Sequence, residues 1–557
     1  MLKDLEKGIK KALIDLNMPE VAFSLEHPKE LSHGDYMTNV ALLVAKTLEV
    51  KPQDIAEQIV ENLKAQDIET VEKIEIAGPG FINFTLKREV FVKGLIDAQD
   101  KEWGNTEVYK GKKILVEHSS PNLFKPFHIG HLMNNTVGEA LYRLAKSSGA
   151  IATPISFPSD ISIGIAKAVY VLLEKYSEDF VPTDVSVLGD AYVEGVKLFD
   201  EDETIHSRVK EIADNLYSQK DSPELRVFEK CKKFNIEYFE DVVKSLGTHF
   251  DSYIYESEAG VEGKKIVLEN TPKVFTESEG AIVYIPSEES KLHTAVFINS
   301  QGNPTYEAKD IGLLDLKFKR YSPDISITVT DNEQTSHFNV VVDAGGKIDP
   351  QWKENSVHRS HGRLSFKGQR TASRLGGVPL VEDIVNSIVE EVKIKNPDVQ
   401  EDTARKIAIA SLKFTILKSK AGSNINFDPE TSLSFEGDSG PYLQYTAVRA
   451  GALLEKGKAL GVFPSNESPI DGTEMLERLI ARFPEVISRS QTEWAPHYVV
   501  TYLLELAQAF NSWYGQGKIV DEEDVSGTAY RLSVVLATRQ SLINGLWALG
   551  IDTPERM

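Results

Sequence analysis

Cysteine is almost absent from this chain of 557 residues, which contains only Cys231. A single cysteine excludes a framework of internal disulfides and fits a reducing compartment, so we expect a cytoplasmic protein. Long apolar runs are missing as well, and residues 1–17 have the pattern of a charged amphipathic helix without the apolar core of a signal peptide. We therefore expect that the protein has no membrane partner.

The chain also has fewer positive than negative side chains. It contains 62 lysines and arginines and 84 aspartates and glutamates, which gives a net charge of −22. This balance argues against indiscriminate nucleic-acid binding, although a basic stripe on an acidic body is enough to bind one particular RNA. The 41% of hydrophobic and 26% of charged residues are typical of well-filled globular cores. The length of the chain predicts three or four domains.

The stretch at 112–149 carries the most informative pattern. An apolar run at 114–116 predicts a buried strand, and Pro121 and Asn122 end it, because proline lacks a ladder donor and asparagine favours turns. From Gly130 onward, apolar residues recur at helical spacing. His128, Gly130 and His131 therefore lie at a helix N-terminus, at the carboxyl edge of a predicted parallel sheet. Helix amides and imidazoles suit a phosphate there, and a glycine allows a nucleotide to approach the backbone.

Two other interpretations exist for the histidine pair. His128 and His131 would also suit zinc, with His118 as a third ligand, or they would cap the helix without any chemistry. Because no cysteine or further histidine lies at ligand spacing, zinc is the minor alternative. We therefore expect no metal ligands among the protein side chains.

The residues around the histidines closely resemble the signature of the arginyl-tRNA synthetases, a class I aminoacyl-tRNA synthetase family. The matching positions are Glu117, Ser119, Ser120, Pro121, Asn122, Lys125, Pro126, His128, Ile129, Gly130, His131 and Leu132. The resemblance implies that His128, Gly130 and His131 bind ATP. It also implies catalytic roles for His128, His131 and Lys125.

A second nucleotide element is expected within 358–377. Class I synthetases have a loop with two lysines there, but Gln369 and Ala372 stand at the corresponding positions of this chain. Both lysine charges are therefore missing. Arg370 and Lys367 are candidates to replace them, and we also expect Lys125 and Arg370 to contact ATP.

A further segment predicts how an amino-acid substrate is recognised. Tyr306 and Asp310 are four residues apart, so one helical turn places them on the same face, and the strand predicted at 325–329 is followed by polar residues. Two carboxylates and an aromatic hydroxyl suit the planar fork of a guanidinium. The resemblance implies that arginine is bound by Glu117, Asn122, Tyr306, Asp310 and Gln334, with Glu256 as a weaker candidate.

The predicted fold is a multidomain α/β protein. We expect a small α+β N-terminal domain at 1–106 and a Rossmann-like parallel-sheet catalytic domain with insertions at 107–380. A connecting helical segment is expected at 381–435 and an all-helical domain at 436–557. The resemblance implies that the first of these domains contacts tRNA, with Phe81 and Asn83 as exposed candidates, and that the last binds the anticodon.

Three other segments have weaker patterns. Residues 200–233 are charged and are interpreted as a solvated helical insertion, and residues 266–285 are interpreted as β-rich. Residues 402–420 predict a helix whose basic residues, Lys413 among them, are a plausible strip for the tRNA backbone.

The resemblance implies ATP-dependent ligation of L-arginine to tRNA(Arg) through an arginyl-adenylate, with Mg²⁺ accompanying ATP, and we expect a monomer. Two alternatives stay open at this point. One is an enzyme of another specificity, either a different class I synthetase or a small nucleotidyltransferase. The other is a non-catalytic tRNA-binding relative, which the missing loop lysines suggest.

Overall fold

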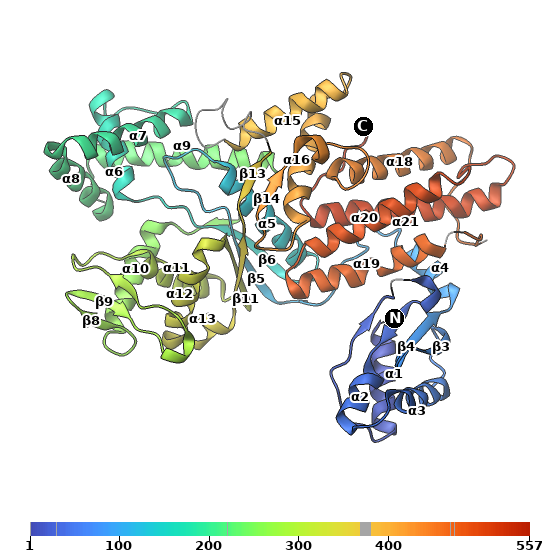
Figure 1. Ribbon diagram of the computed structural model, residues 1–557. Coiled ribbons are helices and arrows are strands. Elements are labelled where there is room, and N and C mark those ends of the chain that lie inside the picture. The colour runs from blue at the N-terminus through green and yellow to red at the C-terminus, as the bar shows by residue number, and fades with distance from the viewer. Residues whose placement is uncertain (1, 29, 220, 368–379, 468, 473) are drawn as a thin grey trace. The chain divides into compact units, whose positions relative to one another are not determined.

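The structure is a computed structural model that describes residues 2–28, 30–219, 221–367, 380–467, 469–472 and 474–557. The chain forms two compact units (Figure 1). One comprises residues 1–101, 453–482 and 512–540, and the other comprises residues 102–452, 483–511 and 541–557. The predicted fold class is confirmed, because the chain combines a parallel sheet, a small N-terminal α+β domain and long C-terminal helices.

A five-stranded sheet forms the centre of the larger unit. Its order is β12-β11-β5-β6-β7, and every neighbouring pair is parallel. The strands are β5 (Lys113–Glu117), β6 (Ile151–Ser156), β7 (Ser252–Tyr253), β11 (Ile325–Asp331) and β12 (Ser356–His361). From β5 the chain continues to β6 on one side and later to β11 on the other. Such a reversal opens a crevice at the carboxyl ends of the strands.

Helix α5 (Ile129–Lys146) follows β5, as predicted, and buries Leu132, Leu141 and Leu144. Its second half is fixed by a buried ion pair in which Arg143 Nε donates to Glu139 Oε1 over 2.6 Å. The other guanidinium nitrogens of Arg143 donate to the carbonyl oxygens of residues 247 and 547. The helix that begins at the two histidines is therefore anchored at its far end.

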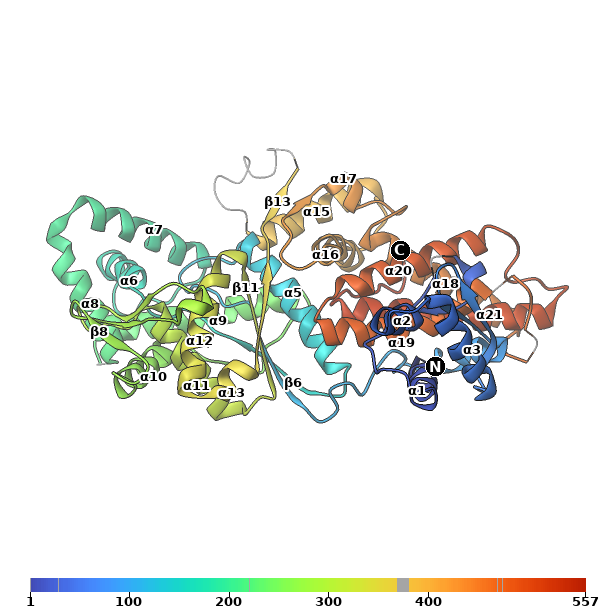
Figure 2. The same ribbon diagram turned by 60° about the horizontal axis from the view of Figure 1, so that its bottom comes forward.

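The insertion after β6 consists of four helices with a core of their own. These are α6 (Ile163–Lys175), α7 (Val185–Glu201), α8 (His206–Ser218) and α9 (Pro223–Ser245), which gather at one edge of the larger unit (Figures 1 and 2). Val209, Ile212, Leu216 and Phe228 are buried in this core. The prediction of a helical insertion at 200–233 is therefore correct, but its interpretation as solvated is wrong, because apolar residues between the charges form a buried stripe.

Cys231 on α9 is fully buried, and burial raises the pKa of its thiol to about 12. Since the thiolate is the reactive form, the native protein should react with a thiol reagent at least about tenfold more slowly than the unfolded chain. Spectrophotometric titration with a disulfide reagent, before and after denaturation, measures this difference. Equal rates in the two states would contradict the burial of this side chain.

A small antiparallel sheet and four helices form the next part of the larger unit. The strands β8 (Thr276–Ser278), β9 (Ala281–Tyr284) and β10 (Ala295–Ile298) pair in the order β10-β9-β8. The helices are α10 (Glu256–Glu269), α11 (Tyr306–Tyr321), α12 (Thr335–Ile348) and α13 (Pro350–Glu354). The β-rich prediction for 266–285 is correct only from Thr276 onward, because Ile266 and Val267 are buried as the last turn of α10.

The connecting segment contains β13 (Leu364–Phe366) and β14 (Ile425–Phe427), which pair in parallel, and the helices α15 (Val381–Lys395), α16 (Glu401–Leu417) and α17 (Pro429–Ser432). Lys413 on α16 is completely buried, and its ammonium donates to the carbonyl oxygens of Leu246 and Gly550 over 2.6 Å each. The prediction that Lys413 faces a tRNA backbone is therefore wrong.

The N-terminal domain has an antiparallel sheet of order β1-β2-β4-β3 covered by helices. Its elements are α1 (Leu2–Asp15), β1 (Leu25–Glu26), β2 (Tyr36–Thr38), α2 (Val40–Leu48), α3 (Pro52–Ala65), β3 (Val71–Ala77), β4 (Phe81–Leu86) and α4 (Arg88–Asp97). Phe81 is partly exposed, but Asn83 is buried with 8% of its surface exposed. The prediction that Asn83 is an exposed tRNA contact is therefore wrong, although its side chain lies on the face of β4 opposite to the core residues Ile82 and Phe84.

Four long helices complete the chain: α18 (Gly440–Ala459), α19 (Glu474–Glu493), α20 (His497–Tyr514) and α21 (Val525–Ala548). Each of them contributes residues to both compact units. The domain boundaries proposed from the sequence stay a prediction. Across the described residues, none of the helices has the length and apolarity that crossing a membrane requires.

Candidate functional site

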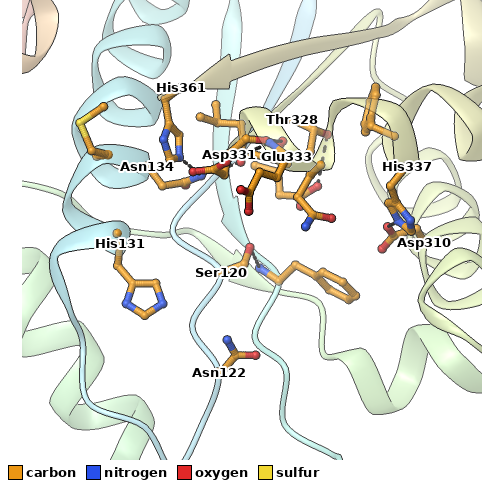
Figure 3. Close-up of a pocket in the computed structure, with 18 of the residues that line it drawn as sticks. Ser120, Asn122, His131, Asn134, Asp310, Thr328, Asp331, Glu333, His337 and His361 are labelled. Atoms are coloured by element: carbon orange, nitrogen blue, oxygen red, sulfur yellow. Dashed lines mark hydrogen bonds and ion pairs between the residues drawn. The ribbon is translucent and has the colours of Figure 1, made fainter. Parts of the chain in front are cut away.

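A pocket of about 1020 Å³ lies at the carboxyl ends of β5 and β11 and at the N-terminus of α5. In Figure 3, His131 stands on one side of this space and Asp310 with His337 on the other, with Ser120 and Asn122 between them. Such a volume is at the upper end of the range for small-molecule pockets. The crevice that the strand order predicts is therefore the site at which most of the candidate residues meet.

His128 and His131 cap α5 reciprocally. The backbone N–H of Gly130 donates to His128 Nδ1, and the backbone N–H of His128 donates to His131 Nδ1, each over 3.1 Å. Since each Nδ1 accepts a hydrogen bond, the proton of a neutral ring lies on Nε2. The two rings also stack, with their centroids 4.0 Å apart. Both histidines therefore offer an Nε2–H donor from a fixed orientation.

Both imidazoles are neutral near pH 7. Burial lowers the pKa of His131 to about 3, and the neighbouring His128 and Lys125 lower it further; burial and the charge of Lys125 also lower the pKa of His128. The backbone N–H groups of His128 and Gly130 already donate the two capping hydrogen bonds. The expectation that helix amides face a phosphate is therefore wrong for these two residues. The Nε2–H groups of the two rings are the donors that can reach a phosphate.

Gly130 lines the pocket at a place where a side chain would crowd the capping ring. A Cβ atom at this position would lie 3.0 Å from His128 Cε1. Gly130 therefore leaves room for the ring of His128, in addition to the open approach that the sequence predicts.

Four carboxylates line the pocket, those of Glu117, Asp310, Asp331 and Glu333, and the two that were predicted to bind arginine, Glu117 and Asp310, each already have a cationic partner. Glu117, at the end of β5, forms a buried ion pair with Lys317 of α11, whose ammonium also donates to Thr328 Oγ1 over 3.0 Å. Asp310 Oδ2 lies 2.6 Å from His337 Nε2. Although burial opposes protonation, Asp310 and Glu307 raise the pKa of His337 to about 10, so His337 is a cation at neutral pH.

The other predicted site residues divide into two groups. Asn122 and Gln334 line the pocket. Lys125, Tyr306 and Glu256 are not among its lining residues. The Lys125 ammonium lies 4.4 Å from the centroid of the Tyr192 ring, and the Tyr306 side chain is exposed beside Lys309. Glu256 is buried in an ion pair with Lys309. Arg370 lies outside the described residues.

Three residues of the site were missed by the sequence analysis. Asn134 ties α5 to the sheet, because its side chain accepts from the backbone N–H of Ser119 and donates to the carbonyl oxygen of Val329. His361 packs against it at the end of β12. Lys317 comes seven residues after Asp310, which is two helical turns. This spacing predicts that both side chains lie on one face of the helix.

Comparisons with known proteins agree along the whole chain. Residues 3–86 match the family described as arginyl tRNA synthetase N terminal domain, residues 95–428 match tRNA synthetases class I (R), catalytic domain, and residues 443–557 match the DALR anticodon binding domain. The arginine–tRNA ligase of Borreliella burgdorferi is 28% identical, over 98% of this chain and 96% of the relative. That of Clostridium perfringens is also 28% identical, over 98% of both chains.

A solved structure has the same fold. The arginyl-tRNA synthetase of Thermus thermophilus superposes with a TM-score of 0.82 at 24% identity, with all of both chains covered. At this level of identity the likeness concerns the fold alone. The catalytic match nevertheless extends over more than half of the chain.

Proposed function

Because this chain belongs to the class I arginyl-tRNA synthetase family, we propose that the crevice pocket is where it activates L-arginine and passes it to tRNA. The protein attaches arginine to tRNA in an ATP-dependent reaction. In the first step a carboxylate oxygen of arginine bonds to the α-phosphorus of ATP, and the bond to pyrophosphate breaks. In the second step a hydroxyl of the terminal tRNA ribose attacks the arginyl carbonyl, and AMP leaves.

The nucleotide side of the proposed site is the N-terminus of α5. The Nε2–H groups of His128 and His131 would donate to phosphate oxygens, and the capping bonds fix both rings before the reaction begins. Phosphoryl chemistry of this kind needs positioning and charge stabilisation, so preorganised donors suit it better than a protein nucleophile does. Lys125 and Arg370 would supply positive charge to the departing pyrophosphate.

Magnesium would arrive with ATP. Among the described residues, no group of three or more His, Cys, Asp or Glu side chains is arranged to hold a metal ion. Mg²⁺ typically keeps several waters and is bound through one or two carboxylates together with substrate phosphates. The described residues therefore suit a magnesium ion that is bound mainly by the phosphates of ATP and that neutralises their charge.

The arginine side of the proposed site is the pair of carboxylates, Glu117 and Asp310. A guanidinium would reach both of them, while Asn122 and Gln334 would hold the amino-acid backbone. The observation that carries the proposal is that two neutral imidazole donors line the same pocket as the carboxylates of Glu117 and Asp310. Tyr306 would have to turn inward to take part. Glu256 is left out, because Lys309 neutralises its carboxylate.

The remaining proposals rest on the sequence. The helical region at 436–557 would read the anticodon of tRNA(Arg), and the domain at 1–106 would contact another part of the same tRNA. We also propose that the protein acts as a monomer in the cytoplasm. Size-exclusion chromatography of the free protein and of its tRNA complex measures the oligomeric state.

ATP–pyrophosphate exchange tests the proposed function. Among the amino acids, only arginine should support exchange, and it should do so only when tRNA is present. Exchange with another amino acid would establish a different specificity. Full tRNA binding without any exchange would identify a non-catalytic relative, and both results would overturn the proposal.

A further inference from the structure

Glu117 and Asp310, two of the four carboxylates that line the pocket, are unusual for a site that receives a cation, because each already contacts a cationic side chain of the protein. Lys317 and Glu117 are almost completely buried, with 1% and 6% of their surfaces exposed. Thr328 Oγ1 joins them, since it accepts from Lys317 Nζ over 3.0 Å and donates to Glu117 Oε2 over 3.4 Å. A buried lysine of this kind is costly unless it is paired, so its position in the pocket wall calls for an explanation.

The second carboxylate is arranged in the same way. His337 contacts Asp310 Oδ2 through Nε2 over 2.6 Å, and its Nδ1 lies 3.5 Å from Glu307 Oε1. The imidazolium is thus held between two carboxylates of α11, and this group of three carries one net negative charge. Figure 3 shows Asp310 and His337 together on one side of the pocket.

In each of the two ion pairs, one carboxylate oxygen contacts the cationic partner and the other oxygen does not. Lys317 and Thr328 contact Oε2 of Glu117, and His337 contacts Oδ2 of Asp310. Within the part of the chain that the structure describes, Glu117 Oε1 and Asp310 Oδ1 have no hydrogen-bond partner in the protein. Each carboxylate therefore offers one oxygen, from the end of β5 in one case and from the first turns of α11 in the other.

We infer that Lys317 and His337 are specificity-determining positioning residues, which fix one oxygen of each carboxylate and cancel charge so that only a forked cation is bound well. This inference rests on the proposed function of the pocket. A guanidinium has five donors in a plane and is weakly hydrated, so it can bridge two separate oxygens. An ammonium is a compact and strongly hydrated charge that reaches only one of them, and a carboxylate that already has a cationic partner attracts it too weakly to replace its water.

The inference predicts what happens when a resident cation is removed. In Lys317→Met the chain length is kept, but Glu117 becomes an unpaired buried carboxylate that attracts any cation. L-Lysine and L-ornithine should then inhibit arginine-dependent exchange more strongly. The ratio of the lysine Ki to the arginine KM should fall at least about tenfold, while the KM for ATP changes less than about twofold. His337→Asn should change the ratio in the same direction by a smaller factor, because His337 is partly exposed to water.

Lys319→Met is the matched control. Lys319 lies two residues further along α11, is exposed, and pairs with Glu262 and Asp315 away from the pocket. Its replacement should leave the Ki-to-KM ratio unchanged. A merely structural role of Lys317 would weaken arginine, lysine and ATP alike or only destabilise the fold, whereas the inferred role changes the selectivity between two cations.

Each outcome decides between these roles. An unchanged ratio in both pocket variants, with arginine-dependent exchange intact in the parent, would overturn the inference and leave the proposed function standing. If the parent shows no arginine-dependent exchange, the proposed function fails, and the inference fails with it. If Lys317→Met does not fold, His337→Asn is the remaining test. An unchanged ratio of the lysine Ki to the arginine KM in that variant overturns the inference.

Discussion

Lys125→Ala should lower the rate of arginine activation by about 10²–10³, which corresponds to about 3–4 kcal/mol of lost transition-state stabilisation. The loop that usually supplies two lysines has Gln369 and Ala372 in their places, so the charge on the departing pyrophosphate lacks its usual partners. Lys125 lies in the turn that leads into α5, close enough for its charge to lower the pKa of His128 and His131. Pre-steady-state exchange measures the effect.

Two further variants control this prediction. Lys125→Arg keeps the charge and should retain much of the rate, and Ala372→Lys in the Lys125→Ala background should restore part of it. Arginine affinity should not change, because Lys125 does not line the pocket and lies over the ring of Tyr192. Activation at the parental rate in Lys125→Ala would assign the role to Arg370 or Lys367 instead.

Asp310→Asn should raise the KM for arginine by roughly 10–100-fold and leave the KM for ATP nearly unchanged. The substitution keeps the shape of the side chain but removes its charge, and a hydrogen bond to a charged group contributes about 1.5–3 kcal/mol. It also removes one of the two carboxylates that hold His337 as a cation. Steady-state exchange at varied arginine and ATP measures both constants.

Glu307→Gln provides the comparison for Asp310→Asn. Glu307 also contacts His337 but does not line the pocket, so its loss should affect arginine much less. If both variants raise the KM for arginine equally, arginine binding depends on the charge of His337 and not on direct contact with Asp310. An unchanged arginine KM in Asp310→Asn would remove Asp310 from the arginine site.

The nucleotide edge of the fold could be predicted because its signals are local. The apolar run of β5, the turn at Pro121 and the helical period of α5 all lie within one stretch of the chain, and the structure has each element where it is expected. Strand β11 was found in the same way. The position of the pocket then follows from strand order, a general property of open parallel sheets.

The residues that escaped prediction depend on partners distant in the sequence. Lys413 has the local pattern of a basic helix face, but its acceptors are the carbonyl oxygens of Leu246 and Gly550. Lys317 and Glu117 are likewise 200 residues apart, and only the packing of α11 against β5 brings them together. Residues 200–233 looked solvated, because their charges outnumber the apolar positions that form a core between helices.

The structure of the protein with arginine and a non-hydrolysable ATP analogue tests the central claim most directly. We predict that the guanidinium lies within hydrogen-bond distance of Glu117 Oε1 and Asp310 Oδ1, with the triphosphate at the Nε2 atoms of His128 and His131. Lys317 and His337 should keep their present contacts. An arginine bound outside this pocket, or bound in it with the guanidinium turned away from both carboxylates, would contradict the account.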